Sequence, residues 1–124
     1  LEGKTIALWG LAFKPGTDDM REAPSLVLIE RLKAAGCNVR AFDPVAIGEA
    51  KRRIGDSIYY ANDIYDALHE ADALMLVTEW KEFRMPNWSI IRKAMNHPVI
   101  IDGRNIFDSH DLTEQGFTYY CIGR

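Results

Sequence analysis

The chain has 124 residues, of which 48% are hydrophobic and 27% charged, as is typical of one globular domain with a single core. Its formal charge of -3 excludes an overall basic field that would recruit nucleic acid or an anionic membrane. No apolar run approaches the roughly 18 residues of a membrane span, and LEGKTIALWG lacks the order of a signal peptide, so we expect a cytoplasmic protein.

The first part of the chain predicts a strand, a helix and a second strand. Residues 4–9 are an apolar run, and residues 25–35 carry apolar side chains at helical spacing. Pro24 suits a first helical turn, and Gly36 suits the position after a last one. Residues 37–42 then read as a strand, which completes a βαβ unit.

The rest of the chain continues this alternation. The pattern predicts helices at 62–70 and 87–95, strands at 73–78, 98–102 and 117–122, and a short polar segment at 111–115. The run at 73–78 is apolar on both faces, as in a parallel strand covered by helices on both sides. We therefore predict one domain with a doubly wound, mostly parallel, Rossmann-like α/β sheet and helices on both faces.

Neither cysteine suggests a metal site. Cys37 and Cys121 lie far apart, and neither belongs to a C-x-x-C or Cys/His cluster, so zinc has no support in the sequence. Each lies in or beside a predicted strand, and we expect a small buried hydrophobic side chain rather than a reactive thiol.

Ligands of such sheets bind outside the carboxyl ends of the strands, where Lys14 and Arg104 both fall. A lysine and an arginine brought together there could hold a diphosphate. The loop GLAFKPGTDDMREAPS (residues 10–25), however, has neither G-x-G-x-x-G nor G-x-x-x-x-G-K-[ST]. From the residues alone, a nucleotide-binding domain and a module that packs on a partner remain equally open.

Four motifs in order decide between these readings. GLAFKPGTDDMREAPS is followed by Phe42-Asp43-Pro44, Thr78-Glu79-Trp80 and Asp102-Gly103-Arg104-Asn105. Together they closely resemble the carboxyl-terminal nucleotide-sugar-binding domain of the UDP-glucose/GDP-mannose dehydrogenase family, especially its bacterial members that oxidise UDP-glucose. The resemblance spans nearly the whole chain.

The resemblance implies a role for four residues. Phe13 and Lys14 match the Phe-Lys pair that contacts the UDP-sugar, and Arg104 matches a further arginine that contacts it. Arg21 matches the arginine that contacts NAD, a cofactor bound mainly by another domain. Each has a plainer alternative: Phe13 could belong to the core, Lys14 could be solvated, and both arginines could pair with neighbouring acids.

The acidic residues of these motifs favour structural roles. Asp18 and Asp19 would repel a diphosphate, so we expect them to form turn hydrogen bonds or to orient Arg21. Asp43 is interpreted as a turn residue before Pro44 rather than a ribose ligand, because the glycine fingerprint is missing. Glu79 and Trp80 are interpreted as packing and loop structure rather than catalysis.

The resemblance also implies that this chain is one domain of a larger enzyme. Family members convert a nucleotide-sugar alcohol to a carboxylate in two NAD-dependent steps, through a thiohemiacetal on a catalytic cysteine. That cysteine, the NAD-binding Rossmann domain and much of the subunit contact of the homo-oligomer lie in regions not represented here. We expect no catalytic residue and no dehydrogenase activity in this chain, whose partners are UDP-glucose, NAD and those other domains. UDP-N-acetylmannosamine, GDP-mannose and a free-standing nucleotide-binding module remain alternatives.

Overall fold

The computed structural model describes residues 2–12, 14, 16–21 and 23–121. Its six strands form one sheet in the order β3-β2-β1-β4-β5-β6, and every neighbouring pair is parallel. The predicted doubly wound parallel sheet is therefore confirmed. The strands are β1 (Thr5–Trp9), β2 (Asn38–Phe42), β3 (Tyr59–Tyr60), β4 (Ala73–Leu76), β5 (Val99–Asp102) and β6 (Thr118–Cys121).

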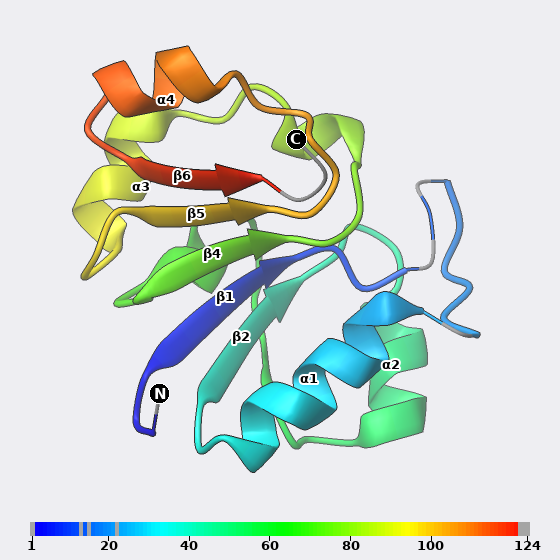
Figure 1. Cartoon of the computed structure of the whole chain (residues 1–124). Helices are drawn as coiled ribbons and strands as arrows, with labels where there is room; N and C mark the ends of the chain where they lie inside the picture. Colours follow the sequence, from blue (N-terminus) through cyan, green and yellow to red (C-terminus); the bar gives the residue numbers. More distant parts are fainter. Residues whose placement is uncertain (1, 13, 15, 22, 122–124) are drawn as a thin grey trace.

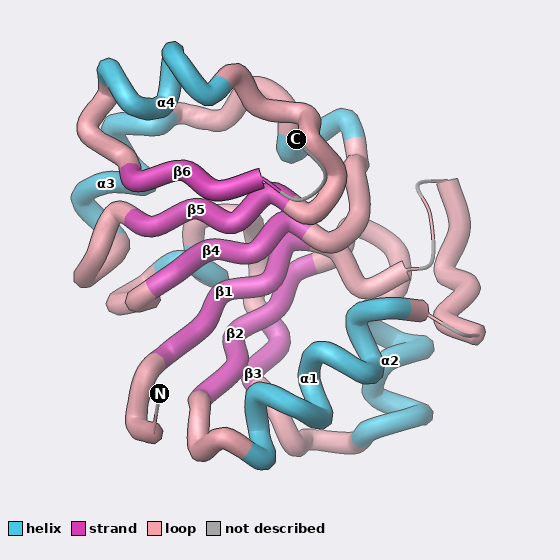
Figure 2. The backbone as a smooth tube through the Cα atoms, viewed as in Figure 1, coloured by secondary structure: helices cyan, strands magenta, loops and turns pink. Residues whose placement is uncertain are grey.

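Helices cover both faces of the sheet, and Figure 1 shows α1 and α2 on one side of it and α3 and α4 on the other. This arrangement follows from right-handed crossovers that run outward from the central pair β1 and β4 in opposite directions. Figure 2 shows the strands as one twisted layer between the helices. The helices are α1 (Pro24–Ala34), α2 (Ile47–Ile54), α3 (Trp88–Ala94) and α4 (Ser109–Glu114), with short 3-10 turns η1 (Asp66–Leu68) and η2 (Lys81–Phe83).

The core is centred on the two inner strands. Trp9, at the end of β1, is fully buried and its ring stacks on that of Phe83, with centroids 5.1 Å apart. The Trp9 indole N–H also donates a hydrogen bond to the Ile64 carbonyl oxygen at 3.1 Å, which satisfies the polar atom of a buried aromatic side chain. Cys37 is buried, as expected for a structural cysteine, whereas Cys121, in β6, is only half-buried.

The helix predicted at 62–70 is wrong, because only the 3-10 turn η1 forms there. The Asp63 carboxylate accepts hydrogen bonds from the backbone N–H groups of Tyr65 and Asp66, and Asp66 in turn accepts one from Asn62 N–H. Aspartate side chains that bind nearby backbone groups offer the chain an alternative to a helix, and here that alternative wins.

Three elements were not predicted. In α2 Ala50 is buried and Ile47 and Ile54 pack against the core, but the helix has only eight residues, and ion pairs from Glu49 to Arg52 and Arg53 also support it. Strand β3 has two residues, too few for a period. The expected polar segment at 111–115 overlaps helix α4, whose N-cap Asp108 accepts a hydrogen bond from Asp111 N–H at 3.1 Å.

No helix in the described part of the chain is long and apolar enough to span a membrane.

Candidate functional site

The polar motifs gather at one edge of the sheet. Strands β2, β1, β4 and β5 are neighbours and parallel, so the loops that follow them leave from the same edge, as Figure 1 shows. The chain direction of the crossovers reverses between β1 and β4, the place where ligands of doubly wound sheets usually bind.

The junction between β1 and β4 is nevertheless closed by side-chain packing. Thr78 is buried and its hydroxyl donates a hydrogen bond to the Ala12 carbonyl oxygen at 2.7 Å. Gly10 has φ +105°, and a Cβ added there would lie 2.6 Å from Thr78 Oγ1. Only glycine permits this close approach of the two loops. A ligand must therefore bind beside this junction rather than within it.

A buried carboxylate organises the loops on the β2 side of the junction. Asp43 is 2% exposed, and its Oδ2 accepts hydrogen bonds from Leu11 N–H at 2.8 Å, Ala12 N–H at 3.0 Å and the Trp80 indole N–H at 3.0 Å. Its Oδ1 accepts from the backbone N–H groups of residues 45 and 46, each at 2.8 Å. Both oxygens are thus directed at protein donors, in agreement with a turn residue. Trp80 is buried, as its packing role requires.

A second buried carboxylate organises the loop after β5. Asp102 is fully buried, and its Oδ1 accepts from the backbone N–H groups of Arg104 at 2.9 Å and Asn105 at 2.7 Å. Its Oδ2 accepts from Ile106 N–H, Phe107 N–H and the Tyr119 hydroxyl, the last at 2.7 Å. Asn105 has φ +59°, the conformation needed to wrap the loop around this carboxylate. The loop backbone that carries Arg104 is therefore held in place.

The Arg104 side chain lies at the surface and pairs with Glu79. Arg104 Nε donates to Glu79 Oε2, and Nη2 donates to Oε1 at 3.1 Å. The side chains are 41% and 23% exposed, respectively. Glu79 follows β4 and Arg104 follows β5, which are neighbouring strands with Leu76 opposite Asp102. The pair therefore bridges two loops through the planar edge of the guanidinium group.

A pocket of about 520 Å³ opens at this pair. A volume of this size is within the range of small-molecule sites, and its rim presents two arginines against one carboxylate, which favours anions. It is lined by Glu79, Arg84, Gly103, Arg104, Asn105 and Ile106. Arg84 and Glu79 were missed as site residues, because only the three-dimensional meeting of two loops distinguishes them from other charged surface residues.

Of the residues predicted on the first loop, Lys14 and Arg21 do not line this pocket. Lys14 is exposed, and within the described residues it makes no hydrogen bond or ion pair. Arg21 is also exposed, and its guanidinium binds Asp19 through Nε at 3.1 Å and Nη2 at 3.0 Å. Phe13 lies outside the described residues. The structure therefore places Arg104 at a pocket whose lining includes neither Lys14 nor Arg21.

Asp19 holds the Arg21 side chain as the sequence suggested. Its Oδ1 also accepts a hydrogen bond from Arg21 N–H at 2.9 Å, so one carboxylate fixes both ends of the arginine. These hydrogen bonds, with the side-chain bond first, lower the pKa of Asp19 to about 2. The carboxylate is therefore ionised at any physiological pH, and the Arg21 guanidinium that it pairs with is exposed.

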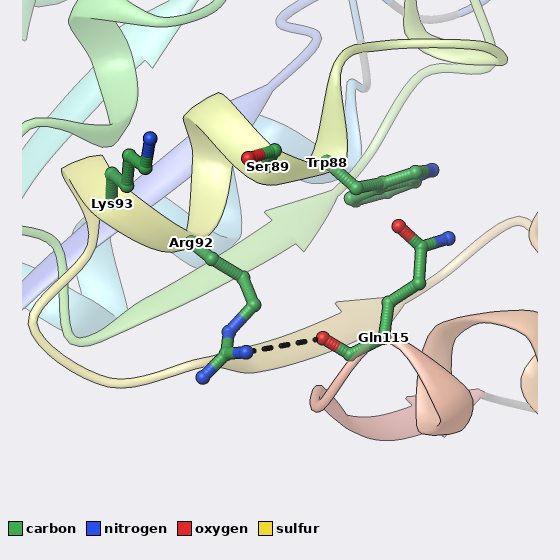
Figure 3. Close-up of a pocket in the computed structure, with 5 residues that line it drawn as sticks. All are labelled: Trp88, Ser89, Arg92, Lys93 and Gln115. Atoms are coloured by element: carbon green, nitrogen blue, oxygen red, sulfur yellow. Dashed lines mark hydrogen bonds between the residues drawn. The ribbon is translucent and has the colours of Figure 1, made fainter.

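Another pocket, of about 420 Å³, lies away from this edge. Figure 3 shows its lining of Trp88, Ser89, Arg92 and Lys93 from α3 with Gln115 opposite. Arg92 Nη1 donates to the Gln115 carbonyl oxygen at 3.4 Å, so this arginine already ties α3 to the turn before β6. Lys14, Arg21 and Arg104 are not among the residues that line it. Within the described residues no group of three or more His, Cys, Asp or Glu side chains could hold a metal ion.

Residues 7–109 match the model of the UDP-glucose/GDP-mannose dehydrogenase family, UDP binding domain. The chain belongs to this family. It is 51% identical to UDP-glucose 6-dehydrogenase of Pseudomonas aeruginosa over 99% of its own length and 28% of that protein. It is 40% identical to UDP-glucose 6-dehydrogenase TuaD of Bacillus subtilis over 100% of its own length and 27% of that protein. The chain thus spans little more than a quarter of these relatives.

Solved structures of family members have the same fold. The structure is similar to a UDP-glucose dehydrogenase from Pyrobaculum islandicum, with a TM-score of 0.80 and 28% identity over 97% of this chain and 25% of that one. It is also similar to a UDP-D-ManNAc dehydrogenase from Pyrococcus horikoshii, with a TM-score of 0.75 and 33% identity over 99% and 26% of the two chains. The family's UDP-binding domain is thus a doubly wound sheet in each case.

Proposed function

We propose that this chain is the nucleotide-sugar-binding domain of an NAD-dependent UDP-glucose 6-dehydrogenase. The observation that carries the proposal is the 51% identity to a UDP-glucose 6-dehydrogenase over 99% of the chain, combined with the pocket at Arg104. The parent enzyme would oxidise UDP-glucose to UDP-glucuronate and reduce two molecules of NAD. Its catalytic cysteine and main NAD site would lie in other parts of a longer protein.

Within this proposal the domain holds the substrate and does not carry out the oxidation. Arg104 supplies a planar donor to a phosphate of UDP-glucose, since its guanidinium has N–H groups beyond those that bind Glu79. Lys14 is a second cation for the UDP-sugar, and Phe13 lies beside it in sequence. Arg21, presented by Asp19, contacts NAD bound by another domain.

The proposal includes the setting of the parent enzyme. It is a homo-oligomer, as the family resemblance implies, and this domain packs on the other domains of its own chain. A cytoplasmic location belongs to the same proposal, because NAD and nucleotide sugars are charged molecules that do not cross a membrane unaided.

A second candidate function is oxidation of another nucleotide sugar. The 33% identity to a UDP-D-ManNAc dehydrogenase favours UDP-N-acetylmannosamine as the alternative substrate. The sugar would be recognised largely by the missing regions, because the pocket here is lined by groups suited to phosphate.

The test is NADH formation by the longer protein that contains this chain, measured with UDP-glucose, UDP-N-acetylmannosamine and GDP-mannose. We expect activity with UDP-glucose and none from the 124-residue chain alone. Arg104→Ala should raise the KM for UDP-glucose about ten- to a hundredfold, as the loss of one charge-assisted hydrogen bond implies. Activity restricted to another sugar would replace the substrate assignment, and an unchanged KM would remove Arg104 from the site.

A further inference from the structure

The role of Glu79 at the pocket depends on the geometry of its ion pair with Arg104. A carboxylate beside a phosphate site can compete with the ligand for Arg104, or it can orient Arg104 for the ligand. Both groups are partly exposed and come from loops after neighbouring strands, so neither is fixed by burial alone. The part of the guanidinium that Glu79 binds separates the two roles.

The ion pair uses one edge of the guanidinium and leaves the other edge available. Glu79 accepts from Nε and from Nη2, which are two of the five N–H donors of an arginine. The remaining three, two on Nη1 and one on Nη2, point away from the carboxylate because the group is planar and rigid. A phosphate can therefore bind Arg104 without displacing Glu79.

The backbone below the pair is already ordered. Arg104 N–H is bound to Asp102 Oδ1 at 2.9 Å, and the next residue, Asn105, is bound to the same oxygen. Gly103 N–H donates to the Leu76 carbonyl oxygen at 3.0 Å, which joins this loop to the end of β4. These backbone bonds do not fix the Arg104 side chain, which has several rotatable bonds, and the hydrogen bonds to Glu79 restrict it.

We propose that Glu79 is a positioning residue, which holds the Arg104 guanidinium toward the pocket for a phosphate of the nucleotide sugar. This inference rests on the proposed function and adds to it a residue that does not itself contact the ligand. The ordering of a long side chain occurs before binding, so its cost does not reduce the affinity. Arg84, on the same pocket, leaves the site cationic despite the carboxylate.

The test combines Glu79→Ala, Arg104→Ala and the double variant in a double-mutant cycle. The binding of UDP is measured by calorimetry, and the kinetics with UDP-glucose are measured in the longer protein. We expect Glu79→Ala to weaken UDP binding and raise KM about three- to tenfold, the effect of freeing one long side chain, with kcat within about twofold. In the Arg104→Ala background, Glu79→Ala should cause no further weakening.

Glu82→Ala is the matched control. Glu82 is an exposed glutamate three residues away, and it does not line the pocket, so its removal changes the local charge equally without freeing Arg104. We expect the dissociation constant of UDP to stay within about twofold. Glu79→Gln, which keeps one acceptor oxygen, should fall between wild type and Glu79→Ala.

The outcomes separate this inference from the proposed function. Tighter UDP binding by Glu79→Ala would identify Glu79 as a competitor and overturn the proposal, as would unchanged binding or equal losses in both arms of the cycle. A wild-type protein that neither binds UDP nor oxidises a nucleotide sugar would overturn the proposed function, and this inference with it. If the wild-type protein binds UDP and the Glu79 variants bind it equally well, the inference alone is overturned.

Discussion

Asp43→Asn is a near-isosteric change that tests whether a buried carboxylate holds together the loops that follow β1, β2 and β4. An asparagine has one acceptor oxygen where Asp43 has two, and its NH₂ group can only donate. With the oxygen toward Leu11, Ala12 and Trp80, the NH₂ group would face two backbone N–H donors; after a flip it would face three donors. Neither orientation satisfies the site.

The expected loss follows from the number of hydrogen bonds. At least two bonds to a charged acceptor disappear, each worth about 1.5–3 kcal/mol, so the free energy of unfolding should fall by about 3–6 kcal/mol. Asp43 is 2% exposed, so water cannot easily replace the lost acceptor. A domain of this size typically has a total free energy of unfolding of about 5–15 kcal/mol, so the melting temperature of the variant should be roughly 10–30 °C lower.

Urea unfolding followed by far-UV circular dichroism measures this loss. Asp18→Asn is the control, because Asp18 is exposed on the first loop, and a surface change of this kind should alter the free energy by no more than about 0.5 kcal/mol. If Asp43→Asn unfolded within about 1 kcal/mol of wild type with an unchanged m-value, the carboxylate would not be the organising group that its contacts indicate.

Two further predictions concern stability. Gly10→Ala should lower the free energy of unfolding by about 2–4 kcal/mol, because it combines a positive φ with overlap on Thr78. Gly16→Ala is the control: Gly16 also has a positive φ, but an added Cβ would meet nothing within 4 Å, so the loss should be smaller. Equal decreases in melting temperature would contradict the role of crowding at Gly10. Acid should also destabilise the domain: hydrogen bonds from Asn62 N–H to Asp66 and from Thr5 N–H to Asp72, with smaller contributions from the neighbouring side chains, lower the pKa of each carboxyl. Their stabilisation is complete above the ordinary aspartate pKa of about 4 and is lost as the pH falls through the lowered values. Asp66→Asn and Asp72→Asn should therefore flatten the decline of the urea midpoint between about pH 5 and 2, and an unaltered pH profile would refute the linkage.

The sheet could be predicted from the sequence because its inner strands are apolar on both faces. Strands β1, β4 and β5 are short uninterrupted apolar runs, a pattern that few other structures produce. Helix α2 was not predicted because it is short and its apolar face has only Ile47, Ala50 and Ile54. The segment at 62–70 was wrongly predicted as a helix because its apolar spacing is helical, whereas the Asp63 carboxylate binds two backbone N–H groups there. Local side-chain hydrogen bonds of this kind are not visible in hydrophobic periodicity.

The candidate site was predictable only in part. The motif around Arg104 identified this arginine as a candidate, and its position after a predicted strand indicated the edge of the sheet where it lies. Glu79 was expected to serve packing and loop structure, and its pair with Arg104 does join two loops, but the partner could not be named because it is 25 residues away. Their meeting depends on the register that sets Leu76 opposite Asp102. Pairs of this kind become visible only when strand order and register are known.

Asp43 and Asp102 together explain how an edge made of loops can be a precise binding surface. Their strands, β2 and β5, flank the central pair β1 and β4, and each carboxylate accepts five hydrogen bonds from protein donors. Buried anions of this kind cannot also serve a phosphate, which they would repel. The charges at this edge therefore lie at different depths: the buried carboxylates fix the backbone, and the Arg104 side chain above them is 41% exposed. Changes at the buried acids should then lower stability, whereas changes at the exposed pair should lower affinity in a folded protein.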